Sequence, residues 1–155
     1  MEVQMASPED AAEIAQQVGA LLGEIMDATG QKAFNFKFED ARSRLSDFLR
    51  QGKYFALVTR MESGEISGFV TMYESFAIYA EGAFGTIAEL FVRPEYRSRS
   101  IGRHLCEAAK ELGAKRGWRR LEVTTPPIPE FDRTLGFYER QGFSVTGGRK
   151  LKYVL

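Results

Sequence analysis

LFVRPEYRSRSIGR, residues 90–103, reads as an apolar strand, a polar turn and the start of an amphipathic helix. Pro94 ends the strand because proline cannot donate a ladder hydrogen bond, and apolar residues recur at helical spacing from Ile101 to Leu112. Such a turn points backbone N–H groups outward, and a helix N-terminus adds its positive end, so the stretch predicts a phosphate or pyrophosphate site. A solvated loop with surface arginines is the alternative. The arginines concerned are Arg93, Arg97, Arg99 and Arg103.

The rest of the chain alternates between strand and helix patterns on both sides of this stretch. Helices are expected where apolar residues recur every three or four positions, at residues 8–29, 38–49, 101–116 and 132–141. Strands are expected at residues 3–6, 54–59, 66–73, 86–92 and 121–125, with a last strand or hairpin over 143–145 and 151–154. Residues 76–85 either finish a strand or form a loop. The order is β-α-α-β-β-β-α-β-α-β, which predicts a single α/β (α+β) domain over residues 1–155 with mixed strand directions.

The charge of the chain is balanced in total and divided between its halves. The 155 residues are 44% hydrophobic, which is enough for a core, and carry 21 basic and 21 acidic side chains. Residues 1–85 hold 13 acids and 7 bases, whereas residues 86–155 hold 8 acids and 14 bases. A neutral total argues against a strongly basic nucleic-acid-binding protein. The basic second half instead predicts a local anionic partner.

Other features of the composition exclude further classes. One cysteine, Cys106, and one histidine, His104, leave no disulfide framework and no cysteine or histidine metal cluster. No apolar run reaches the roughly 18–20 residues that span a membrane. The N-terminal residues lack the basic and apolar regions of a signal peptide. We therefore expect a cytoplasmic protein that binds neither metal nor membrane.

Two motifs in the right order resemble the GNAT family of N-acetyltransferases. Residues 90–103 are similar to the family's acyl-CoA motif, a strand ending in Val-x-Pro-x-Tyr-Arg followed by Arg/Gln-x-x-Gly-x-Gly/Ala and a helix. Residues 137–143, FYERQGF, resemble the second motif, an aromatic pair followed by a turn glycine. The order of elements matches over nearly the whole chain. The resemblance implies a mostly antiparallel twisted sheet with helices on both faces, and acetyl-CoA as co-substrate without a metal.

The resemblance also implies where acetyl-CoA binds. The pantetheine arm would run along Leu90, Phe91 and Val92 as an extra strand held by main-chain hydrogen bonds. A main-chain N–H near Val92 would polarise the thioester carbonyl. The pyrophosphate would lie over the loop and helix start, which comprise Arg97, Ser98, Arg99, Ser100, Ile101, Gly102 and Arg103.

Two positions depart from the family pattern. Ser100 stands where the family usually has glycine, and its Cβ restricts φ and crowds a phosphate, so we expect weaker or displaced binding. Phe131 stands where the family often has an asparagine that contacts the pantetheine arm. These departures leave an alternative open, namely a catalytically idle acyl-CoA-binding sensory domain.

Acid–base chemistry is assigned to two residues. In the family the tyrosine of the second motif often protonates the leaving thiolate, so Tyr138 is the candidate acid; a packed aromatic beside Phe137 is the alternative. Glu89 is the leading base or amine ligand because it is a lone charge in an apolar strand. A salt bridge to a nearby arginine is the alternative for Glu89. For the base, Glu81 is the runner-up, and an ordered-water path is a further alternative.

The acceptor is expected to be the primary amine of a small molecule, and less so that of a protein. The family varies its acceptor site through the first two helices and the hairpin loops. Aromatic and acidic residues there suit a cationic amine, and the candidates are Glu81, Tyr73 and Phe34. Family members often dimerise, so a homodimer is an open expectation.

Overall fold

A five-stranded mixed sheet forms the centre of the structure, a computed structural model that describes residues 1–155. The strands lie in chain order across the sheet, and all neighbours are antiparallel except the last pair, β4 and β5, which is parallel. The chain divides into two compact units, residues 1–124 and 125–155, and each is described by itself. The strands are β1 (Val3–Met5), β2 (Phe55–Arg60), β3 (Ile66–Ala77), β4 (Gly82–Val92) and β5 (Leu121–Val123).

The helices begin and end where the sequence supplies the right residues. The Asp10 carboxylate accepts a hydrogen bond from the Ser7 N–H at 3.0 Å, which closes the first turn. Gly30, with φ of 68°, ends the first long helix in the left-handed conformation that glycine adopts without strain. The helices are η1 (Pro8–Asp10), α1 (Ala11–Thr29), α2 (Phe38–Arg50), η2 (Pro94–Tyr96), α3 (Ile101–Lys115) and α4 (Asp132–Arg140).

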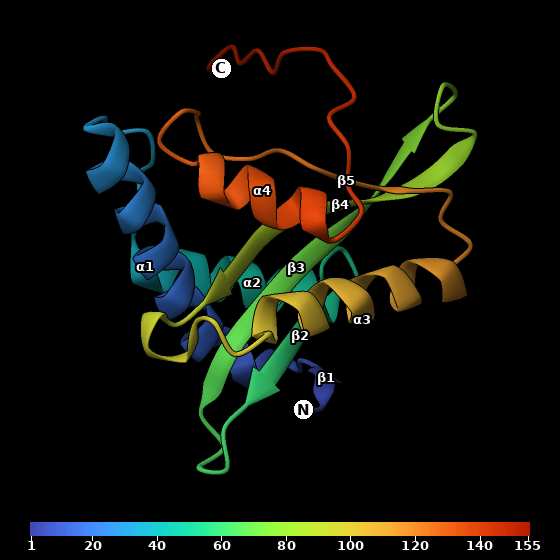
Figure 1. Cartoon of the computed structure of the whole chain (residues 1–155). Helices are drawn as coiled ribbons and strands as arrows, with labels where there is room; N and C mark the ends of the chain where they lie inside the picture. The colour runs from blue at the N-terminus through green and yellow to red at the C-terminus, as the bar shows by residue number, and fades with distance from the viewer. The chain divides into compact units, whose positions relative to one another are not determined.

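Helices cover both faces of the sheet within residues 1–124 (Figure 1). On one face, Ile14 of α1 and Leu45 of α2 belong to a buried cluster with Phe69 of β3 and Phe91 of β4. On the other face α3 packs closely, because a Cβ on Gly68 would lie 3.0 Å from Ile101. The predicted α/β class, with a mixed sheet and helices on both faces, is confirmed.

The β3–β4 hairpin is longer than the sequence pattern predicts. Residues 76–85 are divided between the two strands, which pair as far as Ala77 and Gly82, so the loop is only the short turn 78–81. The hairpin projects beyond the other strands (Figure 1). No helix of the structure combines the length and apolarity needed to cross a membrane.

The last strand or hairpin expected over 143–145 and 151–154 is wrong. Residues 143–155 form neither helix nor strand, and none of them pairs with a strand of the sheet. Gly147 and Gly148, around which a hairpin would turn, both have positive φ as a turn allows, but the residues on either side of them form no strand, and apolar Leu151 and Val154 are largely exposed. Alternating apolar and basic residues predict a strand only where a partner edge and a buried face exist.

Candidate functional site

One edge of β4 is unpaired over its second half. β5 pairs with β4 only over Gly85–Ile87, and residues 88–92 of β4 have no strand on that side. On its other side β4 stays paired with β3 as far as Val92. An unpaired edge presents N–H and C=O groups to which an extended ligand can bind as an additional strand.

A β-bulge decides which residues face this edge. Glu89 pairs with Thr71 and Ile87 with Met72, so Ala88 is an extra residue without a partner. Before the bulge, the Gly85 N–H points toward β5 and donates to Arg120. After it, the N–H groups of residues 89 and 93 point toward β3, since they donate to Thr71 and Ser67. By alternation, the N–H groups of residues 90 and 92 point to the open edge.

The segment after β4 leads into α3 through two residues in the left-handed region. Ser98 has φ of 64° and Ser100 has φ of 63°, which is uncommon for residues other than glycine. Ser100 is the N-cap of α3, and its side chain makes no capping hydrogen bond. Left-handed residues in such a loop turn neighbouring N–H groups to one side, and the helix start adds unpaired N–H groups. The loop 97–103 therefore has the geometry of an anion site.

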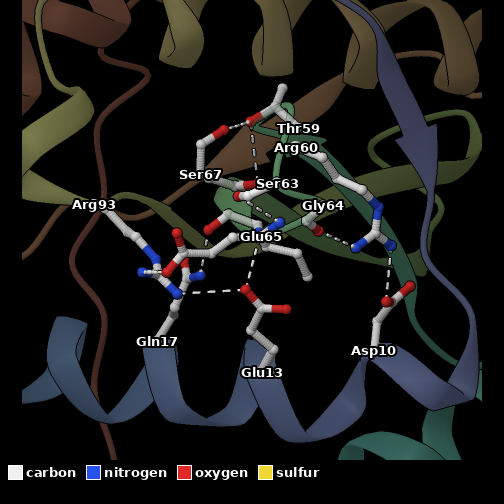
Figure 2. Close-up of polar contacts among 12 residues, drawn as sticks. Asp10, Glu13, Gln17, Thr59, Arg60, Ser63, Gly64, Glu65, Ser67 and Arg93 are labelled. Atoms are coloured by element: carbon white, nitrogen blue, oxygen red, sulfur yellow. Dashed lines mark hydrogen bonds and ion pairs between the residues drawn. The ribbon is translucent and has the colours of Figure 1, made fainter.

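Arg93 fixes the start of this loop to the body of the protein (Figure 2). Its guanidinium pairs with Glu65 and lies 3.3 Å from the Glu13 carboxylate of α1. Glu13 also accepts the Ile66 N–H at 2.7 Å. Arg93 is only 21% exposed, so the pairs are partly shielded from water. This arginine of the motif therefore holds the loop in place and is not available to a ligand.

Arg97, four residues after Arg93, also pairs with a carboxylate of α1. Its Nε donates to the Val92 carbonyl at 2.9 Å, which closes residues 92–97 into a ring. Its terminal nitrogen donates to both Glu24 oxygens of α1, at 2.9 and 3.1 Å. The guanidinium also lies 5.3 Å from the Phe91 ring centre. The side chain of Arg97 thus joins α1 to the open edge of β4.

Glu89 lies half-buried on the face of the sheet that α1 and α2 cover. Thr71 Oγ1 donates to Glu89 Oε1 at 2.8 Å, and the Tyr54 hydroxyl makes a longer contact, 3.5 Å, to Oε2. No basic side chain of residues 1–124 pairs with this carboxylate. Burial raises the pKa of Glu89, and the hydrogen bonds from Thr71 and Tyr54 oppose that rise. Within residues 1–124, Glu89 therefore makes hydrogen bonds to neutral hydroxyl groups and does not form the salt bridge to an arginine that was the alternative expectation.

One tyrosine, Tyr54, contacts Glu89, and a second, Tyr73, stacks on it. The Tyr54 and Tyr73 rings stack with centres 6.1 Å apart and planes 12° apart, and Phe48 of α2 packs against Tyr54 at 5.0 Å. Burial, followed by the charge of Glu89, raises the pKa of Tyr54 far above its usual value. Tyr54 therefore remains a neutral hydroxyl that can donate to the carboxylate.

Tyr138 lies on α4, in the unit formed by residues 125–155. Its ring is in edge contact with Phe137 and Phe143, with centres 5.2 and 5.4 Å away. The Phe143 N–H donates to the Tyr138 carbonyl at 3.0 Å and, with Gly142 at φ of 92°, closes the helix end. The second motif therefore forms a compact aromatic turn.

The acceptor candidates do not come together. Glu81 is exposed in the turn at the tip of the β3–β4 hairpin, and eight residues of extended chain separate it from Glu89 by roughly 25 Å. Phe34 is 37% exposed in the connection between α1 and α2. Only Tyr73 is part of the Glu89 cluster, through its stacking on Tyr54.

The loop residues divide into a buried member and exposed ones. Ile101 is 2% exposed and packs on the sheet, so only its backbone faces the loop. Arg99 lies over the Tyr96 ring, and Arg103 makes a long 3.9 Å ion pair with Glu107. Arg99 and Arg103 thus keep exposed guanidinium groups beside the loop.

Sequence reasoning did not identify Tyr54, Thr71 or Glu24. Each meets its partner through the fold, since Tyr54 and Glu89 are 35 positions apart and Glu24 and Arg97 are 73 positions apart. A strand pairing assigned from the sequence would have found Thr71, which lies opposite Glu89. Nothing local in the sequence points to the other two.

An open strand edge, an anion loop at a helix start and a carboxylate on the same strand are features of an acyltransferase. The model of the acetyltransferase (GNAT) family matches residues 21–143. This is most of the chain, and the chain belongs to that family. An uncharacterized N-acetyltransferase of Bacillus subtilis (strain 168), YhfO, is 26% identical over 151 residues, 96% of this chain and 93% of the relative.

Solved structures show the same fold. A ribosomal-protein-alanine N-acetyltransferase from Brucella melitensis biovar Abortus 2308 has a TM-score of 0.74 and 18% identity over 99% of this chain and 100% of that chain. An aminoglycoside acetyltransferase from an uncultured soil metagenomic sample, in complex with sisomicin, has a TM-score of 0.77 and 19% identity over 99% of this chain and 95% of that chain. The acceptors that these two names give are of different classes.

Proposed function

We propose that this protein transfers the acetyl group of acetyl-CoA to a primary amine of a small molecule by direct attack in a ternary complex. The observation that carries the proposal is the open edge of β4, which continues directly into the anion loop before α3. An edge suits an extended amide-containing arm, and the loop suits a pyrophosphate. Family membership supports acetyl transfer as the class of reaction.

The residues present fit acetyl-CoA, which supplies the acetyl group as a thioester. The N–H groups of residues 90 and 92 can pair with the pantetheine arm, and one of them can donate to the thioester carbonyl. Backbone N–H groups of residues 98–103, with the Arg99 and Arg103 side chains, can hold the pyrophosphate. The Val92 carbonyl already accepts from Arg97, so the arm would pair chiefly with N–H donors.

Glu89 and Tyr138 are proposed as base and acid. Glu89 accepts a proton from the acceptor ammonium, directly or through water, which frees the nitrogen lone pair. A C–N bond forms as the C–S bond breaks, and the Tyr138 hydroxyl donates a proton to the departing thiolate. The second proton that the nitrogen loses as the amide forms restores the tyrosine hydroxyl. The part assigned to Tyr138 rests on the resemblance of residues 137–143 to the family's second motif. The raised pKa of Glu89 makes its carboxylate a stronger base than an exposed one.

The acceptor is proposed to be a small molecule on two grounds. The first 85 residues carry the excess of acidic side chains, which favours a cationic acceptor. The name of one structural neighbour, an aminoglycoside acetyltransferase, gives a precedent for a polycationic small molecule on this fold.

The test follows thiol release from acetyl-CoA with a panel of primary amines, together with CoA binding by calorimetry. We expect amine-dependent release that Glu89→Gln lowers by about 10²–10⁴-fold. Glu39→Gln, an exposed carboxylate on α2, is the matched control and leaves release unchanged. CoA binding without turnover on any amine would instead favour the idle sensory domain, and absence of CoA binding would overturn both assignments.

A further inference from the structure

The Tyr54–Tyr73 pair and the Glu89 carboxylate make up a cluster that the acetyl-transfer chemistry only partly uses. We propose that these three side chains bind the ammonium group of the acceptor, so the acceptor is an alkylamine that arrives as a cation. That the bound cation is the acceptor rests on the proposed function. The cation site itself is a separate claim that goes beyond it.

The first observation is a carboxylate without a cation. Glu89 is half-buried and accepts hydrogen bonds from the hydroxyl groups of Thr71 at 2.8 Å and Tyr54 at 3.5 Å, both of which are neutral donors. Other acidic side chains in contact with the sheet are neutralised, since Glu13 and Glu65 share Arg93 and Asp10 pairs with Arg60 (Figure 2). A partly buried charge is costly unless it is paired. Residues 1–124 therefore supply no positive charge to Glu89.

The second observation is an aromatic surface without a cation. Tyr73 is 38% exposed and stacks on Tyr54, whose other neighbour is Phe48. The faces of aromatic rings are negative and attract ammonium groups, most strongly beside a carboxylate. The tyrosine stack and the carboxylate, which are joined by the Tyr54 hydroxyl, thus both attract a cation.

Arginine guanidinium groups lie over six other aromatic rings of residues 1–124, three of which are buried. Neither Tyr54 nor Tyr73 carries one. The occupied rings are those of Phe55, Tyr79, Phe84, Phe91, Tyr96 and Trp118.

Within this site the two tyrosines have different tasks. Tyr73 offers its ring to the cation, and its hydroxyl is not needed. Tyr54 supports that ring from behind and directs its own hydroxyl at Glu89 Oε2, so it is a positioning residue that favours the ionised carboxylate. Tyr54→Phe keeps the stack and removes only the hydroxyl.

Binding of choline to the protein without acetyl-CoA tests the site independently of catalysis. The neutral comparison is 3,3-dimethyl-1-butanol, which has the same shape without the charge, and both are titrated by NMR. We expect choline to bind at least tenfold more tightly than the alcohol. Equal binding of the two by the unmodified protein would overturn the proposal without any variant.

Three variants sharpen the test. Tyr73→Leu should weaken choline binding about two- to fivefold, the usual contribution of a partly exposed ring, while Tyr73→Phe should restore it. Tyr79→Leu removes an exposed tyrosine at the hairpin tip and should change nothing. Choline binding by Tyr73→Leu equal to that of the unmodified protein would overturn the assignment of the ring.

The positioning role of Tyr54 has its own readout. In an active preparation, Tyr54→Phe should move the acidic limb of the kcat/KM pH profile to higher pH, because Glu89 loses a donor to its charged form. An unmoved limb would remove Tyr54 from the site. Choline binding without acetyl transfer would leave the cation site standing and overturn only the proposed function, whereas acetyl transfer without choline binding would overturn the cation site alone.

Discussion

Replacing Arg97 with alanine removes three contacts at once. Its guanidinium holds the Val92 carbonyl at 2.9 Å and both oxygens of Glu24, and it lies over the Phe91 ring. These contacts, together with the ion pair between Arg93 and Glu13, fix the loop before α3 to α1. We therefore expect Arg97 to shape the anion loop through its side chain rather than to bind phosphate with it.

The size of the effect follows from the exposure of each contact. Arg97 and Glu24 are 44% and 41% exposed, so their ion pair is worth about 0.5 kcal/mol. The charged hydrogen bond to Val92 adds about 1 kcal/mol at this exposure, and the ring contact about 0.5 kcal/mol. Because Arg93 still holds the start of the loop, we expect the lost free energy to divide equally between acetyl-CoA binding and the stability of the fold. The Kd for acetyl-CoA should rise about fivefold, and the free energy of unfolding should fall by about 1 kcal/mol.

Isothermal titration calorimetry with acetyl-CoA measures the change in Kd, and urea unfolding measures the change in the free energy of unfolding. Glu24→Gln is the deciding variant, because it releases the Arg97 side chain without removing it. If Arg97 shapes the loop, Glu24→Gln weakens acetyl-CoA binding by up to about twofold. Tighter binding would show instead that Glu24 restrains a phosphate ligand, which refutes the reasoning. Arg42→Ala, which removes a similar exposed pair with Glu39 on α2, should leave the Kd unchanged.

Three further changes have expected outcomes. Burial raises the pKa of Glu89 above the usual carboxyl value of 4.5, so ionising this carboxyl costs the folded state more than the unfolded state. The free energy of unfolding therefore falls as the pH rises from the usual value through the raised pKa. Glu89→Gln should flatten this part of the pH dependence in urea unfolding, and an unchanged slope would contradict the assignment. Gly85→Ala places a Cβ 2.4 Å from the Trp118 ring and should destabilise by about 2–3 kcal/mol, whereas Gly23→Ala on α1 meets nothing within 4 Å and should stabilise by up to about 1 kcal/mol. Ser100→Gly removes the strain of φ at 63° and the Cβ beside the anion loop, so calorimetry should give a Kd for acetyl-CoA about two- to fivefold lower; a higher Kd would contradict this account of the loop.

Residues close in sequence made most of the fold and part of the site predictable. Pro94 and the apolar spacing after Ile101 fixed the limits of β4 and α3, and a lone charge among apolar residues singled out Glu89. These signals are local, because interactions between residues close in the sequence determine where a strand ends and a helix begins. The final strand was wrong because alternation predicts extended structure without supplying a partner edge.

The side-chain contacts around Glu89 and Arg97 join residues that are far apart in the sequence. Tyr54 reaches Glu89, and Glu24 reaches Arg97, only after the sheet and α1 have packed. Such pairs depend on register and packing rather than on spacing along the chain. The sequence motif therefore indicated a candidate anion-binding segment, but not that two of its arginines pair with the protein's own carboxylates.

The bulge at Ala88 shows how one irregular residue can decide the chemistry of a strand. In a regular strand continuing from Gly85, the N–H groups of odd-numbered residues would all point toward β5, including that of Glu89. The extra residue reverses this order, so residues 90 and 92 face the open edge while the Glu89 N–H turns to Thr71. The same reversal places the Glu89 side chain with Phe91 on the face where Tyr54 and Tyr73 lie, instead of on the face of Gly85. The Glu89 carboxylate and the unpaired N–H groups of residues 90 and 92 thus come from neighbouring residues of one strand. Alternation of apolar and polar residues carries no record of the bulge, because alanine fits either side of a sheet.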